Sequence, residues 1–288
     1  MEYATLNTGA RMPMLGFGVF QVTDLMQCKQ IVLDAIDVGY RLFDTAAVYE
    51  NEAAVGEAIA EAIAMGKVKR EDLFITSKLW VQDMNAYDVD EGIDQSLRNL
   101  GLEYIDLYLL HQAMGDYFSA WRGLEQAYRD GRLMDIGVSN FYPNVLTNFC
   151  ENVDIKPAVN QIELHPYFQQ PDALDTMKYY DVLPEAWAPL GGGRYSPFEE
   201  KLLQDIAETH DKTVGQVVLR WNIQRGVVVI PKTTHKERMI ENINVWDFEL
   251  SQDEMESIST LDLGYGGSRT KPFDPEFVRS VLGVEIHG

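Results

Sequence analysis

The stretch Gly39-Tyr40-Arg41-Leu42-Phe43-Asp44-Thr45-Ala46-Ala47-Val48-Tyr49-Glu50-Asn51-Glu52 decides how the rest of the chain is interpreted. It predicts a short buried strand that ends in an acid, Asp44, with Tyr49 on the loop that follows. Apolar residues at i, i+3, i+4, i+7 and i+8 from Val55 predict a helix that begins near Glu52. A carboxylate and a phenol at the C-terminal end of a strand are candidates for chemistry if the strand belongs to a barrel. An acid that caps the loop and a tyrosine that packs on a rim explain these residues alone equally well.

The length and the charge of the chain limit the possibilities. The 288 residues allow two small domains or one large α/β barrel, which typically needs ~250 residues. Hydrophobic residues make up 46% and charged residues 24%, which is typical of a soluble globular protein. The formal net charge of −21 argues against nucleic acid or an anionic membrane as a partner.

The chain shows no targeting or redox signal. No apolar run approaches the ~20 residues of a membrane span, and the N-terminus has no visible signal peptide. The two cysteines, Cys28 and Cys150, form no metal-binding or redox spacing and lie in helical patterns. We expect buried thiols and a cytoplasmic location.

Short apolar strands alternate with amphipathic helices after an expected β-hairpin at residues 3–13. The eight expected strands cover residues 15–19, 42–44, 73–79, 105–111, 134–139, 158–163, 182–187 and 227–231. No linker separates two halves, so the pattern predicts one α/β domain over residues 1–288, a (β/α)8 TIM barrel with an N-terminal β-hairpin. Two extra helices are expected, one at residues 198–209 and one opening at the capping box Ser251-x-x-Glu254. The tail from Gly264 has no periodicity and is expected to be a loop folded over one face.

Polar and aromatic residues stand where the expected strands end. Besides Asp44 and Tyr49, the ends carry Lys78, Trp80, His111, Ser139, Asn140, Gln161, Glu163, Trp187, Gly191, Gly192, Gly193 and Lys232. Taken singly, each has a structural explanation, such as a lysine that reaches solvent or a glycine-rich loop. A barrel brings all these ends to one face, so together they predict a single site.

Several motifs in order resemble the aldo-keto reductase family over essentially the whole chain. The matching stretches are Gly39–Ala46 with Glu52 and Gly56, Lys78-Leu79-Trp80, Leu109-Leu110-His111, Gly137-Val138-Ser139-Asn140-Phe141, Asn160-Gln161-Ile162-Glu163 and Ile230-Pro231-Lys232. The chain is most similar to the bacterial branch that contains the diketogluconate and glyoxal reductases. The resemblance implies a monomeric, NADPH-dependent oxidoreductase that reduces small-molecule carbonyls (aldehydes, dicarbonyls or keto sugars) to alcohols.

The resemblance implies a catalytic tetrad of Asp44, Tyr49, Lys78 and His111. A carbonyl that accepts a hydride develops alkoxide charge and needs a proton, which free tyrosine with a pKa of ~10 donates poorly near neutral pH. A cation beside the phenol lowers its pKa, and Lys78 is expected to do so while Asp44 holds it in position. His111 is expected to orient the carbonyl oxygen, and Tyr49 to be the general acid in reduction.

The cofactor site is not of the Rossmann type, because no Gly-x-Gly-x-x-Gly follows a first strand. The resemblance implies that Ser139, Asn140 and Gln161 bind the carboxamide of the nicotinamide. Trp187 replaces the tyrosine that stacks on the nicotinamide ring in many members. The other implied cofactor-binding residues are Thr45, Leu190, Gly191, Gly193, Lys232, Thr233, Arg238, Glu241 and Asn242.

A basic cluster favours NADP(H) over NAD(H). Thr234-x-x-Glu237 predicts a capping box and a helix that starts at about Thr234. Its N-terminus, with Lys232, Thr233 and Arg238, would form an anion site for the 2′-phosphate. A solvated helix face is the alternative interpretation.

Substrate contacts and other functions remain open from the sequence. Val19, Phe20, Trp80 and the tail are expected to line an apolar mouth, with His111 and Tyr49 at its floor. A cofactor-sensing binding module and a Schiff-base aldolase that uses Lys78 are alternatives. A metal-dependent hydrolase would need a His-x-His motif after the first strand. The five histidines form no such motif, so no metal is expected.

Overall fold

A computed structural model describes residues 1–193, 195–271 and 273–287 of the chain. The N-terminal hairpin pairs β1 (Tyr3–Thr5) with β2 (Arg11–Pro13) in antiparallel register. Eight parallel strands form a second sheet in the order β10-β9-β8-β7-β6-β5-β4-β3, so every strand pairs with its neighbour in sequence. These strands are β3 (Phe17–Gly18), β4 (Leu42–Asp44), β5 (Phe74–Leu79), β6 (Ile105–Leu110), β7 (Leu133–Ser139), β8 (Val159–Glu163), β9 (Leu183–Trp187) and β10 (Val228–Val229).

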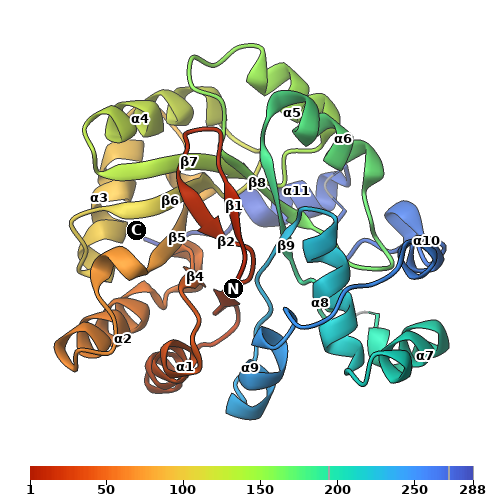
Figure 1. The fold of residues 1–288 in the computed structure, drawn as a ribbon. Helices are drawn as coiled ribbons and strands as arrows, with labels where there is room; N and C mark the ends of the chain where they lie inside the picture. The colour runs from red at the N-terminus through yellow and green to blue at the C-terminus, as the bar shows by residue number, and fades with distance from the viewer. Residues whose placement is uncertain (194, 272, 288) are drawn as a thin grey trace.

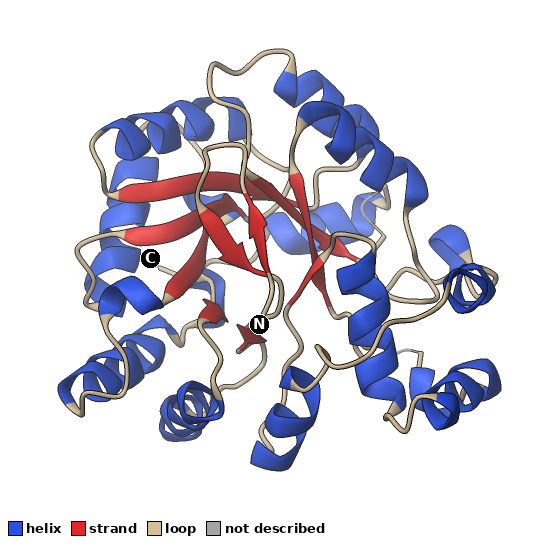
Figure 2. Ribbon diagram, in the orientation of Figure 1, coloured by secondary structure: helices blue, strands red, loops and turns tan. Residues whose placement is uncertain are grey.

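The two edges of this sheet meet. The backbone N–H of Gly16 donates to the carbonyl oxygen of Val229 (2.8 Å), and the N–H of Val229 donates to that of Met14 (3.1 Å). A parallel bridge joins Leu15 to Val229 at the same place. The helices surround the curled sheet (Figure 2), as expected for a (β/α)8 barrel.

Helices follow the strands, and several of their ends obey local rules. Asp24 caps the first helix by accepting from the N–H groups of Met26 and Gln27, and Gly39 ends it at φ 116°. The helices are α1 (Leu25–Val38), α2 (Glu52–Ala64), α3 (Val89–Leu100), α4 (Tyr117–Arg129), α5 (Pro143–Cys150), α6 (Pro171–Tyr180), α7 (Lys201–Thr209), α8 (Val214–Gln224), α9 (Lys236–Ile243), α10 (Gln252–Ser259) and α11 (Pro275–Leu282).

The C-terminal tail is not the loop that the sequence indicated. It contains α11, whose N-cap Asp274 accepts from the N–H of Glu276. The described residues therefore contain three helices beyond one per barrel strand (one between β9 and β10, then α10 and α11), not two. Eight residues give too short a periodic pattern for the sequence to reveal this helix. Figure 1 shows the hairpin in front of the barrel strands and α11 behind them, so the two cover opposite ends.

The two predicted capping boxes have different outcomes. Ser251 and Glu254 form theirs at the start of α10. The box predicted at Thr234 is wrong, because α9 begins at Lys236 and its N-cap His235 makes no side-chain cap. The hydroxyl of Thr233 instead accepts from the N–H of His235 (3.1 Å), which turns the chain before the helix.

The core is continuous from the barrel interior to the helix layer. Cys28 and Cys150 are buried free thiols, as predicted. Gly56 lets α2 approach the next unit, because a Cβ there would lie 2.2 Å from the carbonyl oxygen of Leu100. None of the helices in the described ranges has the length and apolar character to cross a membrane.

Candidate active site

A cavity of about 520 Å³ opens at the C-terminal ends of the barrel strands. Most of the residues that the strand ends suggested line it. These are Phe20, Asp44, Tyr49, Trp80, His111, Ser139, Asn140, Gln161, Trp187, Leu190 and Lys232.

Lys78 stands at the centre of this site and is fully buried. Its Nζ lies 2.7 Å from Oδ1 of Asp44 and 2.8 Å from the carbonyl oxygen of Thr45. It also lies 3.4 Å from the hydroxyl of Tyr49. One ammonium group therefore joins the carboxylate, the backbone and the phenol.

The fold explains this meeting. Asp44 is the last residue of β4, and Lys78 lies near the end of β5, the neighbouring parallel strand. Tyr49 is the last residue of the 3₁₀ turn η1 (Ala47–Tyr49). Buried hydrogen bonds on either side of this turn hold the loop in place. The hydroxyl of Thr45 donates to Asn51 (2.7 Å), and the Asn51 amide donates to the carbonyl oxygen of Val19 (3.1 Å).

The electrostatics of the pair differ from the prediction in one respect. Desolvation raises the pKa of Tyr49 above its ordinary value, and the positive charge of Lys78 opposes this without reversing it. The net lowering of the tyrosine pKa that the sequence indicated is therefore wrong. Burial disfavours charge on Lys78, but the nearby Asp44 carboxylate leaves the lysine pKa raised.

His111 follows β6 and lies beside the phenol. Its ring centroid is 5.6 Å from that of Tyr49 and 5.2 Å from that of Trp80, both edge-on. Phe20 also packs on Tyr49, with ring centroids 4.9 Å apart. Desolvation first, and then the charge of Lys78, hold the pKa of His111 well below its usual range, so the imidazole is neutral at pH 7.

A second polar chain crosses the barrel beneath the cavity. Gln161 Nε2 donates to Asp44 Oδ2 (2.8 Å) and to Glu185 Oε2 (2.9 Å). The Ser139 hydroxyl donates to the carbonyl oxygen of Gln161 (2.9 Å). These bonds thus link three neighbouring strands, β7, β8 and β9, to β4 across the barrel.

Asn140 joins the remaining groups. Its backbone has φ 62°, which asparagine tolerates better than most residues. Its amide donates to the carbonyl oxygen of His111 (3.1 Å), and its Oδ1 accepts from the indole N–H of Trp187 (2.9 Å). The indole ring of Trp187 is therefore fixed at the cavity wall.

The glycine-rich loop after β9 lies along one side. Gly191, Gly192 and Gly193 all have positive φ. A Cβ on Gly191 would lie 2.3 Å from the carbonyl oxygen of Tyr195, so this loop needs glycine there. Of the three, Gly192 lines the cavity and the predicted Gly191 and Gly193 do not.

Two exposed cations stand near the start of α9. Lys232 lines the cavity, and Arg238 lies in the helix. Neither has a carboxylate within 4 Å in the part of the chain that the structure describes, whereas Lys236 pairs with Asp34 at 3.0 Å. Two unpaired cations in a chain of net charge −21 fit an anionic ligand.

Other predicted residues lie outside the cavity lining. Val19 is wrong as a substrate contact, because it is fully buried in the core, and Gly18 and Gln21 line the cavity instead. Thr45 is also fully buried and meets Lys78 through its carbonyl group. The remaining residues outside the lining are Thr233, Arg238, Glu241 and Asn242, and the Glu241 carboxylate accepts from Thr213 (2.7 Å).

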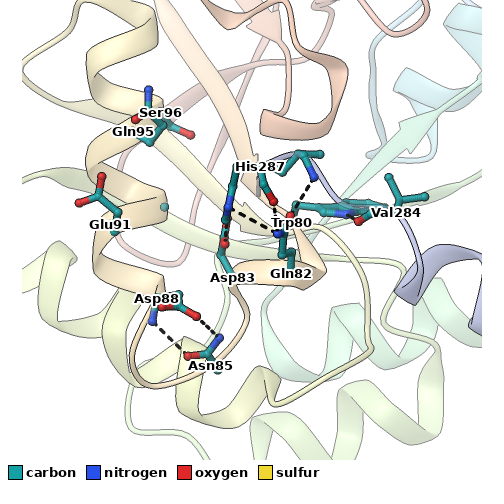
Figure 3. A network of polar contacts seen from close by, with 12 residues as sticks. Trp80, Gln82, Asp83, Asn85, Asp88, Glu91, Gln95, Ser96, Val284 and His287 are labelled. Carbon is teal, nitrogen blue, oxygen red and sulfur yellow. Dashed lines mark hydrogen bonds and ion pairs between the residues drawn. The ribbon is translucent and has the colours of Figure 1, made fainter.

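The tail after α11 is hydrogen-bonded to the residues that follow β5, at one side of the cavity (Figure 3). The indole N–H of Trp80 donates to the carbonyl oxygen of Val284 (2.7 Å). His287 Nε2 lies 2.7 Å from Asp83 Oδ1, and Gln82 donates to the His287 carbonyl (2.6 Å). These bonds hold the α11 segment where Phe277, Val281 and Val284 form an apolar wall.

Sequence reasoning missed two polar groups, Arg269 and Glu185, and it assigned no contact to Glu163. Glu163 is fully buried and accepts from the N–H of Arg269 (2.7 Å) and the hydroxyl of Ser268 (2.9 Å), which anchors the tail. Arg269 lines the cavity and donates to the Gly192 carbonyl (3.2 Å). Glu185 lies two residues before Trp187, and this alternation in a buried strand is a signal that it points inward.

The chain is similar to known proteins in both sequence and fold. The sequence model of the Aldo/keto reductase family matches residues 14–262. Glyoxal reductase of Bacillus subtilis is 44% identical over 258 residues, covering 89% of this chain and 91% of the relative. Methylglyoxal reductase DkgA of Escherichia coli O157:H7 is 41% identical, covering 90% and 93%. The crystal structure of Bombyx mori aldo-keto reductase AKR2E4 in complex with NADP has a TM-score of 0.87 and 36% identity, covering 91% of this chain and 92% of that one. With this likeness in sequence and fold along most of its length, the chain belongs to the aldo/keto reductase family.

Proposed function

We propose that this protein is an NADP(H)-dependent reductase that converts aldehydes, dicarbonyls or keto sugars to alcohols with Tyr49 as the general acid. The observation that carries the proposal is the contact of Lys78 Nζ with both the Asp44 carboxylate and the Tyr49 hydroxyl inside the cavity. The dicarbonyl class draws support from the relatives named glyoxal and methylglyoxal reductase.

Each residue of the tetrad has a physical task. NADPH, when bound, supplies the hydride, and the protein positions it. The carbonyl oxygen then becomes an alkoxide, which takes the proton of the Tyr49 hydroxyl. Lys78 stabilises the phenolate that remains, and Asp44 keeps Lys78 charged in a buried place. In the reverse direction Tyr49 is the base.

His111 is suited to hold the carbonyl oxygen. Its Nδ1 is buried and has no hydrogen-bond partner among the described residues. We infer the neutral tautomer with the proton on Nε2, because this avoids a buried unpaired N–H. An Nε2–H that faces the substrate oxygen would orient it beside the Tyr49 hydroxyl.

The cavity wall fits a nicotinamide dinucleotide phosphate. Gln161, Ser139 and Asn140 offer acceptor oxygens for the N–H groups of the carboxamide, and the fixed indole of Trp187 offers a face for the ring. Glycines at the loop after β9 allow close approach of a diphosphate. The unpaired Lys232 and Arg238 are the proposed site of the 2′-phosphate.

The contacts of Lys78 disfavour a Schiff-base aldolase. An amine must lose its proton to attack a carbonyl, yet the nearby Asp44 leaves the pKa of Lys78 raised. Borohydride trapping with substrate would label Lys78 only if this argument failed. Oxidation of NADPH on addition of methylglyoxal would distinguish a reductase from a cofactor-sensing module, which binds the cofactor without turnover.

The decisive variant is Tyr49→Phe. We expect kcat for methylglyoxal reduction to fall ~10³-fold, within the range of lost general-acid catalysis. The Kd of NADPH, from quenching of tryptophan fluorescence, should stay within about twofold, since the hydroxyl rather than the ring acts. Tyr179→Phe, on the exposed face of α6, is the matched control and should leave both values unchanged. Equal loss of turnover and binding would contradict the assigned role.

A further inference from the structure

Glu185 is a buried acid that the proposed chemistry does not use. It lies on β9 with no exposed surface. Its Oε2 accepts from Gln161 Nε2 at 2.9 Å. Its Oε1 is enclosed and has no hydrogen-bond partner among the described residues. A fully buried carboxyl oxygen without a partner is costly, so its role needs an explanation.

The amide of Gln161 couples Glu185 to the tetrad. Its Nε2 donates to Asp44 Oδ2 at 2.8 Å as well as to Glu185. Both hydrogens of the amide are therefore used, and its oxygen is left for the cavity that Gln161 lines. Two acids thus orient the group that we assign to the nicotinamide.

The charges around Glu185 do not balance if every acid is ionised. Asp44 on β4, Lys78 on β5 and Tyr49 on η1 are the titratable groups that act on it. Lys78, the one cation among these described groups, is already paired with Asp44 at 2.7 Å. Burial, and then the charge of Asp44, raise the pKa of Glu185 to about 8. Near neutral pH Glu185 therefore holds a proton.

We propose that Glu185 matches the charge of the site to the redox state of the cofactor, protonated beside the neutral reduced nicotinamide and ionised beside the cationic oxidised one. Trp187, two residues along the same strand, and Gln161 are the groups we assign to the nicotinamide, so this inference rests on the proposed function. Glu185 is a positioning residue in this scheme, because it acts through Gln161 and through its charge.

The proton step is simple. On binding of NADP⁺ the Glu185 carboxyl group loses its proton to solvent water and becomes a carboxylate, and no electron moves. The positive ring and the new carboxylate then neutralise each other at short range, where the effective dielectric is below that of water. NADPH brings no charge on the ring, so Glu185 keeps its proton.

The test is the pH dependence of the ratio of the two dissociation constants. Kd for NADP⁺ and for NADPH are measured by quenching of tryptophan fluorescence from pH 6.5 to 8.5. The 2′-phosphate is common to both cofactors, so its own titration cancels in the ratio. We expect the ratio Kd(NADP⁺)/Kd(NADPH) to fall about tenfold over this range, the equivalent of one pKa unit. In E185Q, a neutral group of the same size, the ratio should stay constant.

Proton release gives a readout that needs no variant. In weak buffer with a pH indicator at pH 7.5, wild-type protein should release a proton on mixing with NADP⁺ and not with NADPH. E125Q is the matched control, because Glu125 is a buried acid on α4 that accepts from the N–H of Ile155 (2.8 Å) and does not line the cavity. E125Q should retain the wild-type pH dependence of the Kd ratio and should release a proton on binding NADP⁺ as the wild type does.

A wild-type ratio constant within twofold, or an unchanged slope in E185Q, would overturn the inference. Binding of neither cofactor would instead overturn the proposed function, so the two failures are distinguishable.

Discussion

The Nζ atom of Lys78 lies 2.7 Å from Oδ1 of Asp44, and both side chains are buried at the floor of the cavity. Asp44→Asn removes the counter-ion and leaves an uncompensated ammonium in a place where burial disfavours charge. We expect a loss of ~3–5 kcal/mol in the free energy of unfolding at pH 7, measured with urea. In the folded wild type the pKa of Lys78 is raised above its value in the unfolded chain. The stabilisation by the pair is therefore complete below the pKa of the unfolded chain, and it is lost as pH rises through the pKa of the folded protein. The contribution of the pair in the wild type should therefore be complete at pH 10 and decline only above the ordinary lysine value of 10.5.

The control for this prediction is an exposed ion pair. Lys201 pairs with Asp205 on the surface of α7. Asp205→Asn should change the free energy of unfolding by less than ~0.5 kcal/mol, because exposed pairs contribute little. If Asp44→Asn cost no more than this control, the buried pair would not stabilise the floor of the cavity.

The double variant Lys232→Ala/Arg238→Ala tests the phosphate site. Both cations lack a carboxylate within 4 Å among the described residues, so their removal breaks no ion pair that the structure shows. We expect the Kd of NADPH to rise at least ~100-fold, since two charge-assisted bonds to a phosphate contribute about 1.5–3 kcal/mol each. The Kd of NADH should change less than about threefold. Both are measured by fluorescence quenching at fixed ionic strength.

Lys236→Ala provides the matched control on the same helix, because Lys236 pairs with Asp34. It should leave the preference for NADPH unchanged. An equal loss for NADPH and NADH in the double variant would place the 2′-phosphate elsewhere.

The barrel and its site differ in how far the sequence predicts them. The meeting of Asp44, Lys78 and His111 is predictable because parallel strands bring their C-terminal ends together. The direction of a side chain at a strand end is not predictable in the same way. The sequence places Val19 in the cavity, but its neighbours Gly18 and Phe20 line the cavity and Val19 does not. A one-residue difference in a strand end reverses the face.

Long-range contacts were the other limit. Glu163 anchors the tail through Ser268 and Arg269, more than a hundred residues away, and no local pattern encodes that pairing. The pKa of Tyr49 was misjudged for a related reason. The cation was visible in the motif, but the extent of desolvation depends on everything packed around the phenol.

Trp80→Phe tests the role of the tail. The change keeps an aromatic ring beside His111 and removes the N–H that bonds the Val284 carbonyl. We expect faster proteolysis after α11 and a KM for bulky aldehydes raised about three- to tenfold, since one hydrogen bond contributes ~1 kcal/mol. The Kd of NADPH should not change.

Trp246→Phe is the comparison, because the buried indole N–H of Trp246 has no partner in the described ranges. It should alter neither proteolysis nor KM. Identical behaviour of the two variants would show that the bond to Val284 does not hold the tail.

The pH dependence of turnover should differ between the two directions. Reduction needs protonated Tyr49, and the raised pKa of Tyr49 keeps the hydroxyl protonated at neutral and mildly basic pH. Alcohol oxidation needs the phenolate, so kcat for oxidation with saturating NADP⁺ should rise with pH and reach no plateau below about pH 9. Reduction with saturating NADPH should stay level between pH 6.5 and 8.5, and neutral His111 adds no titration there because its pKa lies well below its usual range. Lys78→Met removes the charge that opposes desolvation, so the rise in oxidation should move to still higher pH. An oxidation plateau already reached at pH 8 would mean that the cation outweighs burial, the opposite of the balance in this structure.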